Sequence, residues 1–192
     1  MKGRPETLSV LIGLASDRPG VGKSTAAQYL AEKYGFVIVS IGESVKSELD
    51  IMLRSQGFRY DESRKDEFRP ALSWWTEFRL QNSGRDYWLQ AVGQQLRSHR
   101  LTVVPDVRYP DEAEYLSELG GLVVKIERND VIRSQLASEM ALDSFRFKYV
   151  IENSEGDLGA SMCAQLDEFL SSHYHTSVQC ELRDGAQCRS RS

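Results

Sequence analysis

Short apolar runs along the chain alternate with segments in which apolar residues recur every three or four positions. Leu8–Leu14 is one apolar run, and Phe36–Ile41 is a second. Between them, Lys23–Tyr34 has apolar residues at helical spacing, and Gly35 stands where a glycine commonly ends a helix. A strand, turn, helix and strand within about 30 residues predict a βαβ unit with a right-handed crossover.

The same alternation continues to residue 170. Further strands are predicted at Leu101–Pro105, Leu122–Glu127 and Tyr149–Glu152, and further helices at Asp111–Leu119, Asp130–Leu142 and Leu158–Leu170. Glu43–Gly93 is mostly helical in character and carries many aromatic and charged residues. Strands that alternate with helices predict an α/β fold in three layers, with a five-stranded, mostly parallel sheet between two layers of helices.

The pattern also sets the domain limits. Residues 1–172 are predicted to form one domain, which suits the chain length of 192 residues. Residues 43–98 are predicted to be a helical insert, and residues 128–143 a lid. Residues 173–192 contain little apolar material, so they are expected to be a disordered tail.

The overall charge, hydrophobicity and cysteine content of the chain limit which classes of partner we expect. A formal charge of −4 provides no large basic field for nucleic acid. No apolar run approaches the roughly 20 residues that cross a bilayer. The three cysteines form no CxxC pair, so they indicate neither a disulfide framework nor a zinc site. We therefore expect small molecules as partners and a reducing, cytoplasmic location, and we leave a homodimer open.

A glycine-rich turn separates the first predicted strand from the first predicted helix. It consists of Pro19, Gly20, Val21, Gly22, Lys23, Ser24 and Thr25. Glycines let several backbone N–H groups point inward, and the amino end of the following helix favours an anion. Lys23 would place its ammonium on the β- and γ-phosphates of a nucleotide, and Ser24 would offer its hydroxyl to Mg²⁺. The segment therefore predicts a phosphate loop for ATP and Mg²⁺; the alternative is an ordinary glycine-rich turn.

Asp17 departs from the strict GxxxxGK[ST] pattern, which has glycine at this position. Aspartate tolerates left-handed backbone better than most residues, so the turn is compatible with it. A carboxylate beside a triphosphate is unfavourable unless it points away. Asp17 is included among the nucleotide-binding residues on that condition.

A second acid follows the third predicted strand. In open α/β sheets, ligands bind beyond the carboxyl ends of the strands, so Asp106 is expected beside the phosphate loop. There it would orient Mg²⁺ through water, or the acceptor. Arg108 could hold an acceptor phosphate with its planar guanidinium. The alternative is that Asp106 caps a turn and Arg108 is a solvated surface residue.

The helical insert offers cations and aromatic rings, the two features that a nucleotide acceptor needs. Arg69 and Arg79 are the preferred phosphate ligands of this segment, and Trp75 is a candidate surface for the base. The alternative is that the aromatic residues are core contacts. Arg128, after the fourth strand, or Arg133 in the next helix could stabilise the charge that develops in phosphoryl transfer.

These residues resemble the bacteriophage-type deoxynucleoside monophosphate kinases, within the P-loop nucleoside monophosphate kinase superfamily. After the phosphate loop, the most specific match is the run that ends the third strand and begins the next helix: Asp106-Val107-Arg108-Tyr109-Pro110-Asp111-Glu112-Ala113-Glu114. Other matches are Phe68-Arg69-Pro70, Trp75-Thr76-Glu77-Phe78-Arg79, Asp86-Tyr87-Trp88 and Val150-Ile151-Glu152-Asn153. They span residues 8 to about 170 in the family's order.

The resemblance implies a P-loop fold with an acceptor-binding helical insert and a lid, ATP as donor, Mg²⁺, and a deoxynucleoside monophosphate as acceptor. It gives Lys23 and Ser24 the donor role. It implies positions around the acceptor for Arg69, Thr76, Glu77, Arg79, Asp106, Arg108 and Glu112. The location implied is the cytoplasm, which is the host's if the chain is phage-encoded.

Three residues depart from the family's pattern. Asp17 replaces the first loop glycine, Trp75 stands where the family usually has glycine, and Leu136 stands where a histidine usually precedes Ser138-Glu139. Two alternatives stay open. One is a P-loop kinase for another small phosphorylated metabolite or coenzyme precursor. The other is a non-catalytic nucleotide-binding protein, although the chain has no guanine-reading NKxD motif.

Overall fold

The computed structural model describes residues 9–131, 141–154 and 159–189. Within them, one sheet has five strands in the order β2-β3-β1-β4-β5, and every neighbouring pair is parallel. The strands are β1 (Val10–Ala15), β2 (Val37–Ile38), β3 (Leu101–Val107), β4 (Leu122–Glu127) and β5 (Tyr149–Glu152). The prediction of an α/β fold with a five-stranded parallel sheet is confirmed.

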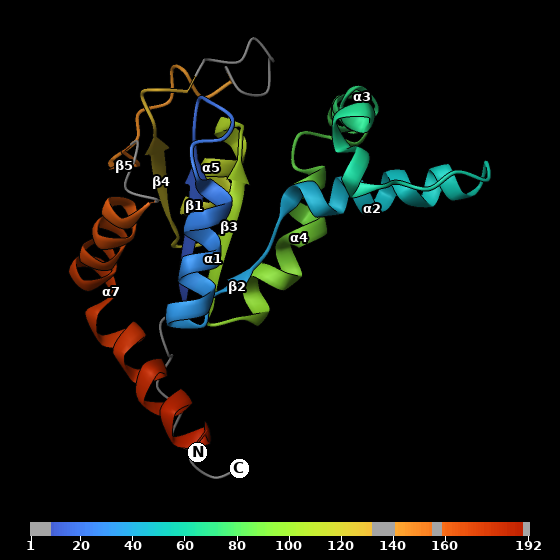
Figure 1. The fold of residues 1–192 in the computed structure, drawn as a ribbon. Coiled ribbons are helices and arrows are strands. Elements are labelled where there is room, and N and C mark those ends of the chain that lie inside the picture. The colour runs from blue at the N-terminus through green and yellow to red at the C-terminus, as the bar shows by residue number, and fades with distance from the viewer. Residues whose placement is uncertain (1–8, 132–140, 155–158, 190–192) are drawn as a thin grey trace.

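Helices cover both faces of this sheet (Figure 1). On one face lie α1 (Lys23–Tyr34) and the first part of α7 (Ala160–Arg189). On the other face lie α5 (Pro110–Glu118), α2 (Ile41–Arg54) and α4 (Tyr87–Ser98). The short 3₁₀ helix η1 (Glu62–Arg64) and α3 (Lys65–Ser83) complete the insert, and Figure 1 shows α3 to one side of the sheet.

Strand β1 is buried on both faces, as a central parallel strand should be. Ile12 and Leu14 contribute to the core under α1 and α7, whereas Leu11 and Ala15 contribute to the core under α5. Gly13 lies between them, and a Cβ there would come within 2.7 Å of Leu116 Cδ1. Glycine at this position lets α5 pack closely against the central strand.

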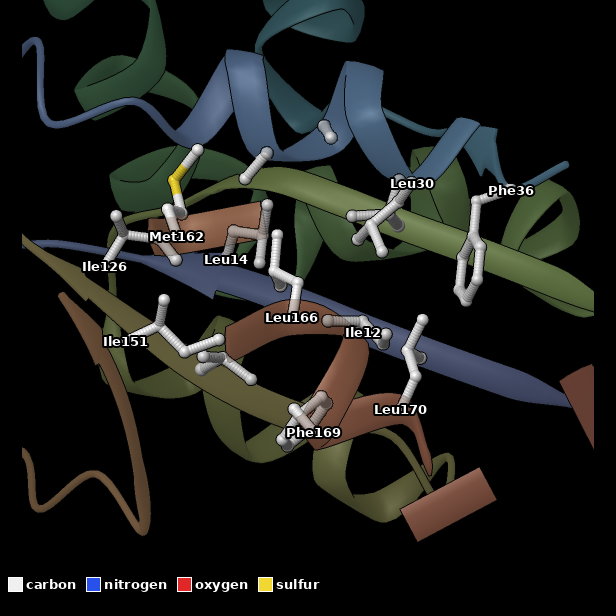
Figure 2. Close-up of a cluster of buried hydrophobic side chains, with 14 of the residues drawn as sticks. Ile12, Leu14, Leu30, Phe36, Ile126, Ile151, Met162, Leu166, Phe169 and Leu170 are labelled. Carbon is white, nitrogen blue, oxygen red and sulfur yellow. The ribbon is translucent and has the colours of Figure 1, made fainter. Parts of the chain in front are cut away.

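The core between α1, α7 and the sheet is a continuous set of apolar side chains (Figure 2). Leu30 of α1 and Leu166 of α7 are fully buried against Ile12 of the central strand. A polar tether adds to this packing at its edge. Asp167 Oδ1 accepts hydrogen bonds from Tyr29 Oη at 2.8 Å and Tyr34 Oη at 2.6 Å, so one carboxylate joins α7 to α1.

Several element boundaries differ from the sequence prediction by a few residues, and the ends of β2 and β3 bear on the site. The second strand ends at Ile38 instead of Ile41, because α2 begins there with Ser40 as its N-cap; Ser40 Oγ accepts from the Glu43 amide at 3.1 Å. The third strand extends to Val107, so Asp106 lies inside the strand. The helical insert therefore begins slightly earlier than predicted, at Ile41.

The last described helix, α7, runs into the segment 173–192, whose disorder stays a prediction. α7 continues to Arg189, with non-helical backbone at Tyr174 where φ is −136°. His173 packs edge-on against Tyr149 of β5, with ring centroids 4.6 Å apart, and Tyr174 contacts Phe169. These aromatic contacts extend the ordered core past residue 172. Most of the predicted lid, including Arg133 and Leu136, lies in 132–140, outside the described residues.

We predict that Leu166→Ala lowers the free energy of unfolding by about 2–5 kcal/mol, because it leaves a cavity between α7, α1 and the sheet. Leu166 has no exposed surface, whereas Glu168 on the same helix is exposed. Urea denaturation would measure both variants. Glu168→Ala should change the unfolding free energy by less than about 0.5 kcal/mol; equal losses in the two variants would contradict the assignment of this core.

Candidate functional site

The turn between β1 and α1 has the backbone that an anion cradle requires. Gly22 and Gly20 have φ values of 103° and 69°, in the left-handed region where a side chain is unfavourable. Lys23 begins α1, and its Nζ donates to Ser16 Oγ, which in turn donates to the Arg18 carbonyl at 2.7 Å. The lysine head is therefore held over the loop.

The members of the predicted loop divide by exposure. Pro19, Gly20, Ser24 and Thr25 are exposed, so a ligand at the loop could meet the Gly20 amide and the Ser24 and Thr25 hydroxyls, whereas Pro19 has no N–H to donate. Val21 is 1% exposed, and its side chain belongs to the core under α1 and α7. Val21 therefore anchors the loop from below and contributes only its backbone to the cradle.

Asn153, directly after β5, holds the loop from the other side. Its Nδ2 donates to the Val21 carbonyl at 2.8 Å, and its backbone N–H donates to the Glu127 carbonyl at 2.8 Å. A Cβ on Gly22 would lie 2.5 Å from Asn153 Nδ2. Asn153 is 7% exposed, so this contact is a buried polar link between the loop and the ends of β4 and β5.

The carboxylate of Asp17 is buried and has a cationic partner. Its Oδ2 lies 3.5 Å from Lys125 Nζ, and Lys125 also pairs with Glu127 at 2.5 Å. The lysine on β4 offsets the negative charge that Asp17 brings to the phosphate loop. The condition placed on Asp17 from the sequence, that its carboxylate point away from a triphosphate, stays a prediction.

Arg18 connects the phosphate loop to the segment after β4. Its Nη1 donates to the carbonyls of Arg128 at 3.3 Å, Asn129 at 3.1 Å and Val131 at 2.9 Å. The guanidinium of Arg128 bonds Asp130, with Nε to Oδ1 at 2.8 Å. Arg128, predicted to act on the transferred phosphoryl group, therefore follows β4 with its guanidinium paired with Asp130.

Asp106 reaches across to the amino end of α2. Its Oδ2 accepts from the Gly42 amide at 2.6 Å and from Ser40 Oγ at 2.8 Å, and its Oδ1 accepts from the Ile41 amide at 3.1 Å. Both carboxylate oxygens thus bond the first turn of that helix. The structure assigns Asp106 a capping role, on α2 rather than on the turn that follows β3, and direct ligation of a metal would have to compete with these bonds.

Glu112 bonds the start of α5, much as Asp106 bonds the start of α2. Its Oε2 accepts from the Arg108 amide at 2.6 Å and the Tyr109 amide at 3.1 Å. Burial raises the pKa of Glu112 to about 7, although these two amides lower it, and the neighbouring charge of Asp106 raises it further. A buried carboxyl group that titrates near neutrality therefore lies beside the predicted acceptor residues, while the Arg108 side chain is exposed.

Two residues predicted to bind the acceptor form a half-buried tether inside the insert. Glu48 of α2 accepts from Trp75 Nε1 at 3.1 Å and from the Arg79 guanidinium, and Tyr87 Oη donates to it at 2.7 Å. The Arg79 guanidinium lies between the Trp75 and Tyr87 rings, 4.9 and 4.7 Å from their centroids. In this structure Arg79 and Trp75 join α2, α3 and α4, and they are absent from the lining of the cavity described below.

The remaining predicted acceptor residues of α3 are dispersed. Arg69 is exposed and pairs with Asp66 at 2.9 Å. Thr76 Oγ1 donates to the Leu72 carbonyl at 2.8 Å, within its own helix. Glu77 is exposed and accepts from Gln81 Nε2 at 3.0 Å. Of these three, only Glu77 lies along the cavity, because α3 turns Arg69 away from it.

A cavity of about 330 Å³ lies between the insert and the start of α5. It is lined by Glu77, Leu80, Gln81, Arg85, Trp88, Leu89, Tyr109, Asp111 and Glu112. β3 precedes α5 and is the neighbour of β1, which precedes the phosphate loop. The cavity and the loop therefore open from the same edge of the sheet, at the carboxyl ends of adjacent strands.

Sequence analysis identified the loop but missed several residues that build the site. Asn153 was part of a quoted match without a role, and Glu48, Gln81 and Arg18 carried no signal. Trp88 was likewise part of a quoted match without a role, and Arg85 belongs to a segment described only as aromatic and charged. No pattern within one segment marks these residues, because their roles come from contacts between elements far apart in the chain.

Neither a metal cluster nor a membrane-spanning helix is found in the described parts of the chain. No three His, Cys, Asp or Glu side chains there gather as ligands for a metal ion. None of the described helices is both long enough and apolar enough to cross a bilayer.

We predict that Gly22→Ala lowers the free energy of unfolding by more than about 2 kcal/mol, since it adds a clash with Asn153 to the strain of positive φ. The matched control is Gly20→Ala, which also has positive φ but has no atom within 4 Å of the added Cβ. That variant should lose about 1 kcal/mol from strain alone. Urea denaturation measures both, and equal losses would argue against the Asn153 contact.

Glu112 gives a pH prediction. Its pKa is raised in the folded state, so the stability it contributes is fully present below its ordinary pKa of 4.5 and is lost as pH rises through about 7. Glu112→Gln keeps an acceptor for both amides without the charge. Between pH 5 and 8 the wild type should lose about 2–3 kcal/mol relative to this variant. Glu114→Gln, exposed on the same helix, should track the wild type; parallel pH curves for all three proteins would refute the assignment.

Comparison with known proteins supplies one relative by sequence. No protein-family profile matches the chain. A protein of Acanthamoeba polyphaga mimivirus named "Putative deoxynucleotide monophosphate kinase" is 28% identical over 174 residues, which cover 76% of this chain and 89% of that protein. The match thus extends over most of both chains.

Solved structures with a similar arrangement include two small-molecule kinases. Dephospho-CoA kinase from Campylobacter jejuni has a TM-score of 0.49 at 15% identity, covering 85% of this chain and 97% of its own. Shikimate kinase from Acinetobacter baumannii has a TM-score of 0.48 at 16% identity, covering 88% of this chain and 97% of its own. Structural similarity at this level does not identify the acceptor that the chain would phosphorylate.

The chain carries a phosphate loop on a parallel sheet. The resemblance found in the sequence is confirmed: over most of its length the chain is similar to a protein named as a deoxynucleotide monophosphate kinase.

Proposed function

We propose that the chain transfers the γ-phosphoryl group of ATP to a deoxynucleoside monophosphate, giving ADP and the deoxynucleoside diphosphate. The observation that supports this proposal is the cavity of about 330 Å³ at the start of α5, which opens at the same edge of the sheet as the phosphate loop because β3 and β1 are parallel neighbours. ATP bound at the phosphate loop and an acceptor bound in the cavity would meet at their phosphates. The name of the mimivirus relative supports the choice of acceptor.

On the donor side, the phosphate loop would bind the triphosphate. Exposed amides around Gly20 and the ammonium of Lys23 suit the β- and γ-phosphates. Ser24 is exposed at the start of α1, where its hydroxyl would hold Mg²⁺ together with the phosphates. When bound, Mg²⁺ neutralises charge that develops on the phosphate oxygens. Asp106 would act on the metal only through water, because its oxygens bond the first turn of α2.

On the acceptor side, the cavity walls combine apolar and polar surfaces. Leu80, Leu89 and Trp88 suit the faces of a nucleobase, and Glu77 and Tyr109 lie along the same walls. Arg85 is exposed at the cavity and lies 3.4 Å from Asp111. Arg85 and Arg108 are the cations that we propose for the acceptor phosphate, ahead of Arg69 and Arg79, since Arg79 is committed to Glu48.

The chemistry needs no covalent intermediate on the protein. An oxygen of the acceptor phosphate would attack the γ-phosphorus while the bond to the ADP oxygen breaks, and the protein contributes positioning and charge. Lys23 would stay with the phosphates as charge moves toward ADP. Arg128 is the proposed cation of the lid, and its release from Asp130 would accompany that role.

Two alternatives remain distinguishable by experiment. The acceptor could be another small phosphorylated metabolite or coenzyme precursor, or the chain could bind nucleotide without transfer. A coupled ADP-release assay over the four deoxynucleoside monophosphates and a set of phosphorylated metabolites separates these alternatives. Turnover with a non-nucleotide acceptor alone would replace the proposed substrate. The proposal includes no nucleic acid or membrane partner; a homodimer and a cytoplasmic location remain expectations.

We predict that Lys23→Ala lowers kcat by about 100- to 1,000-fold or more, because one cation on the transferred phosphoryl group is lost. The fold should be retained, as judged by circular dichroism and thermal unfolding. Lys65→Ala is the matched control: Lys65 is 50% exposed and pairs only weakly with Glu62 at 3.3 Å. Its turnover should equal that of the wild type, and undiminished turnover of Lys23→Ala would exclude the phosphate-loop assignment.

A further inference from the structure

Arg18, in the phosphate loop, bonds the backbone that follows β4 at three points. Its Nη1 donates hydrogen bonds to the carbonyl oxygens of Arg128 at 3.3 Å, Asn129 at 3.1 Å and Val131 at 2.9 Å. Bonds from a charged donor are stronger than bonds between neutral groups. One side-chain nitrogen therefore holds three carbonyls of a short segment turned toward a single point.

The segment 128–131 lies beyond the pairing of the sheet. β4 ends at Glu127, and the Glu127 carbonyl accepts from the Asn153 amide at 2.8 Å. Strand pairing therefore positions the chain as far as Glu127. Past that residue, the three bonds from Arg18 tie the backbone to the phosphate loop.

The residue before Arg18 makes a second link between the same two parts of the molecule. Asp17 Oδ2 lies 3.5 Å from Lys125 Nζ, and Lys125 stands in β4 opposite Ala15 of β1. Asp17 and Arg18 thus bind β4 and the segment after it from adjacent positions of one turn. Asp17, the departure from the phosphate-loop pattern, therefore helps to attach the loop to β4.

Arg18 also contacts the surroundings of both cations proposed to act on the transferred phosphoryl group. Its carbonyl accepts from Ser16 Oγ at 2.7 Å, and Ser16 Oγ accepts from Lys23 Nζ. Its guanidinium bonds the carbonyl of Arg128. The backbone of Arg18 thus supports the lysine, and its side chain fixes the backbone from which the Arg128 side chain extends. One residue joins the two cations across the edge of the sheet.

We propose that Arg18 is a positioning residue for phosphoryl transfer. It holds the backbone of Arg128 against the phosphate loop, so that Arg128 and Lys23 act on the same phosphoryl group. This inference rests on the proposed function, since it concerns the reaction at that loop. Arg18 acts through Arg128 and touches no reacting atom in this role. A cation stabilises developing charge only from the correct position, and a displacement of about 1 Å can cost about 100-fold in rate.

A double-mutant cycle on the full chain tests this role. ADP release is measured with saturating ATP and the deoxynucleoside monophosphate that the wild type turns over fastest. We expect Arg128→Ala to lower kcat by about 100-fold or more, and Arg18→Ala to lower it by about 10-fold. Because Arg18 acts through Arg128, adding Arg18→Ala to Arg128→Ala should change kcat by less than about twofold. Losses that multiply in the double variant would overturn the role.

Two further measurements separate positioning from support of the fold. The KM for ATP in Arg18→Ala should stay within about threefold, because the loop amides and Lys23 still bind the phosphates. All three bonds of Arg18 come from one nitrogen, so Arg18→Lys should recover part of the lost kcat. Arg18→Met has no donor and should match Arg18→Ala. A residue that only supports the fold would lower thermal stability and raise the KM for ATP, and equal kcat values for Arg18→Lys and Arg18→Met would contradict the role.

Arg54→Ala is the matched control. Arg54 is 58% exposed and pairs with Asp50 on its own helix at 2.6 Å, so its kcat should equal that of the wild type. If Arg18→Ala does not fold, the cycle is run with Arg18→Lys, whose smaller loss should also disappear in the Arg128→Ala background.

The outcomes separate this inference from the function it rests on. Turnover by the wild type, with an unchanged kcat in Arg18→Ala, would overturn the role of Arg18 and leave the proposed function standing. Turnover with a non-nucleotide acceptor alone would replace the proposed substrate, and the same cycle with that acceptor would still decide the role of Arg18. If no acceptor supports turnover, both the proposed function and the role of Arg18 are overturned.

Discussion

The parallel pairing of β1 with β3 and β4 is the constraint on which the rest of this structure depends. Because all strands run in one direction, every loop that follows a strand opens at the same edge of the sheet. The phosphate loop follows β1, the run from Arg108 to Glu112 follows β3, and Asn153 follows β5. Segments that are more than 130 residues apart in the chain, such as Val21 and Asn153, thereby come within hydrogen-bond distance.

Carboxylates at this edge mainly organise backbone and helices. Asp106 bonds the first turn of α2, Glu112 bonds the amides that begin α5, and Glu48 gathers a tryptophan, an arginine and a tyrosine from two helices. Each placement satisfies N–H groups that a buried helix end or a buried side chain would otherwise leave unbonded. The acids that fix the insert to the sheet therefore also fix the shape of the cavity beside the phosphate loop.

Some arginines make contacts that hold the structure together and others face solvent, and the residue type alone does not predict which. Arg79 and Arg69 lie ten residues apart on the same helix, yet Arg79 is enclosed between two rings on Glu48, whereas Arg69 is exposed beside Asp66. Arg18 donates hydrogen bonds to the carbonyls that follow β4. Whether a guanidinium faces solvent or is enclosed depends on the side chains that the fold brings near it; Arg85 is 84% exposed although it pairs with Asp111, whereas Arg79 is largely enclosed.

The sequence by itself determined the fold class, the phosphate loop and the resemblance to a kinase family, because these depend on periodicity and on residues adjacent in the chain. It determined β4 and α1 to the residue, since their patterns have clear ends. Only the tertiary structure decided that Asp106 caps α2, that Trp75 and Arg79 form a tether, and that Trp88 lines the cavity. The physical reason is that a side chain's partner is set by packing between distant elements, which local spacing does not encode.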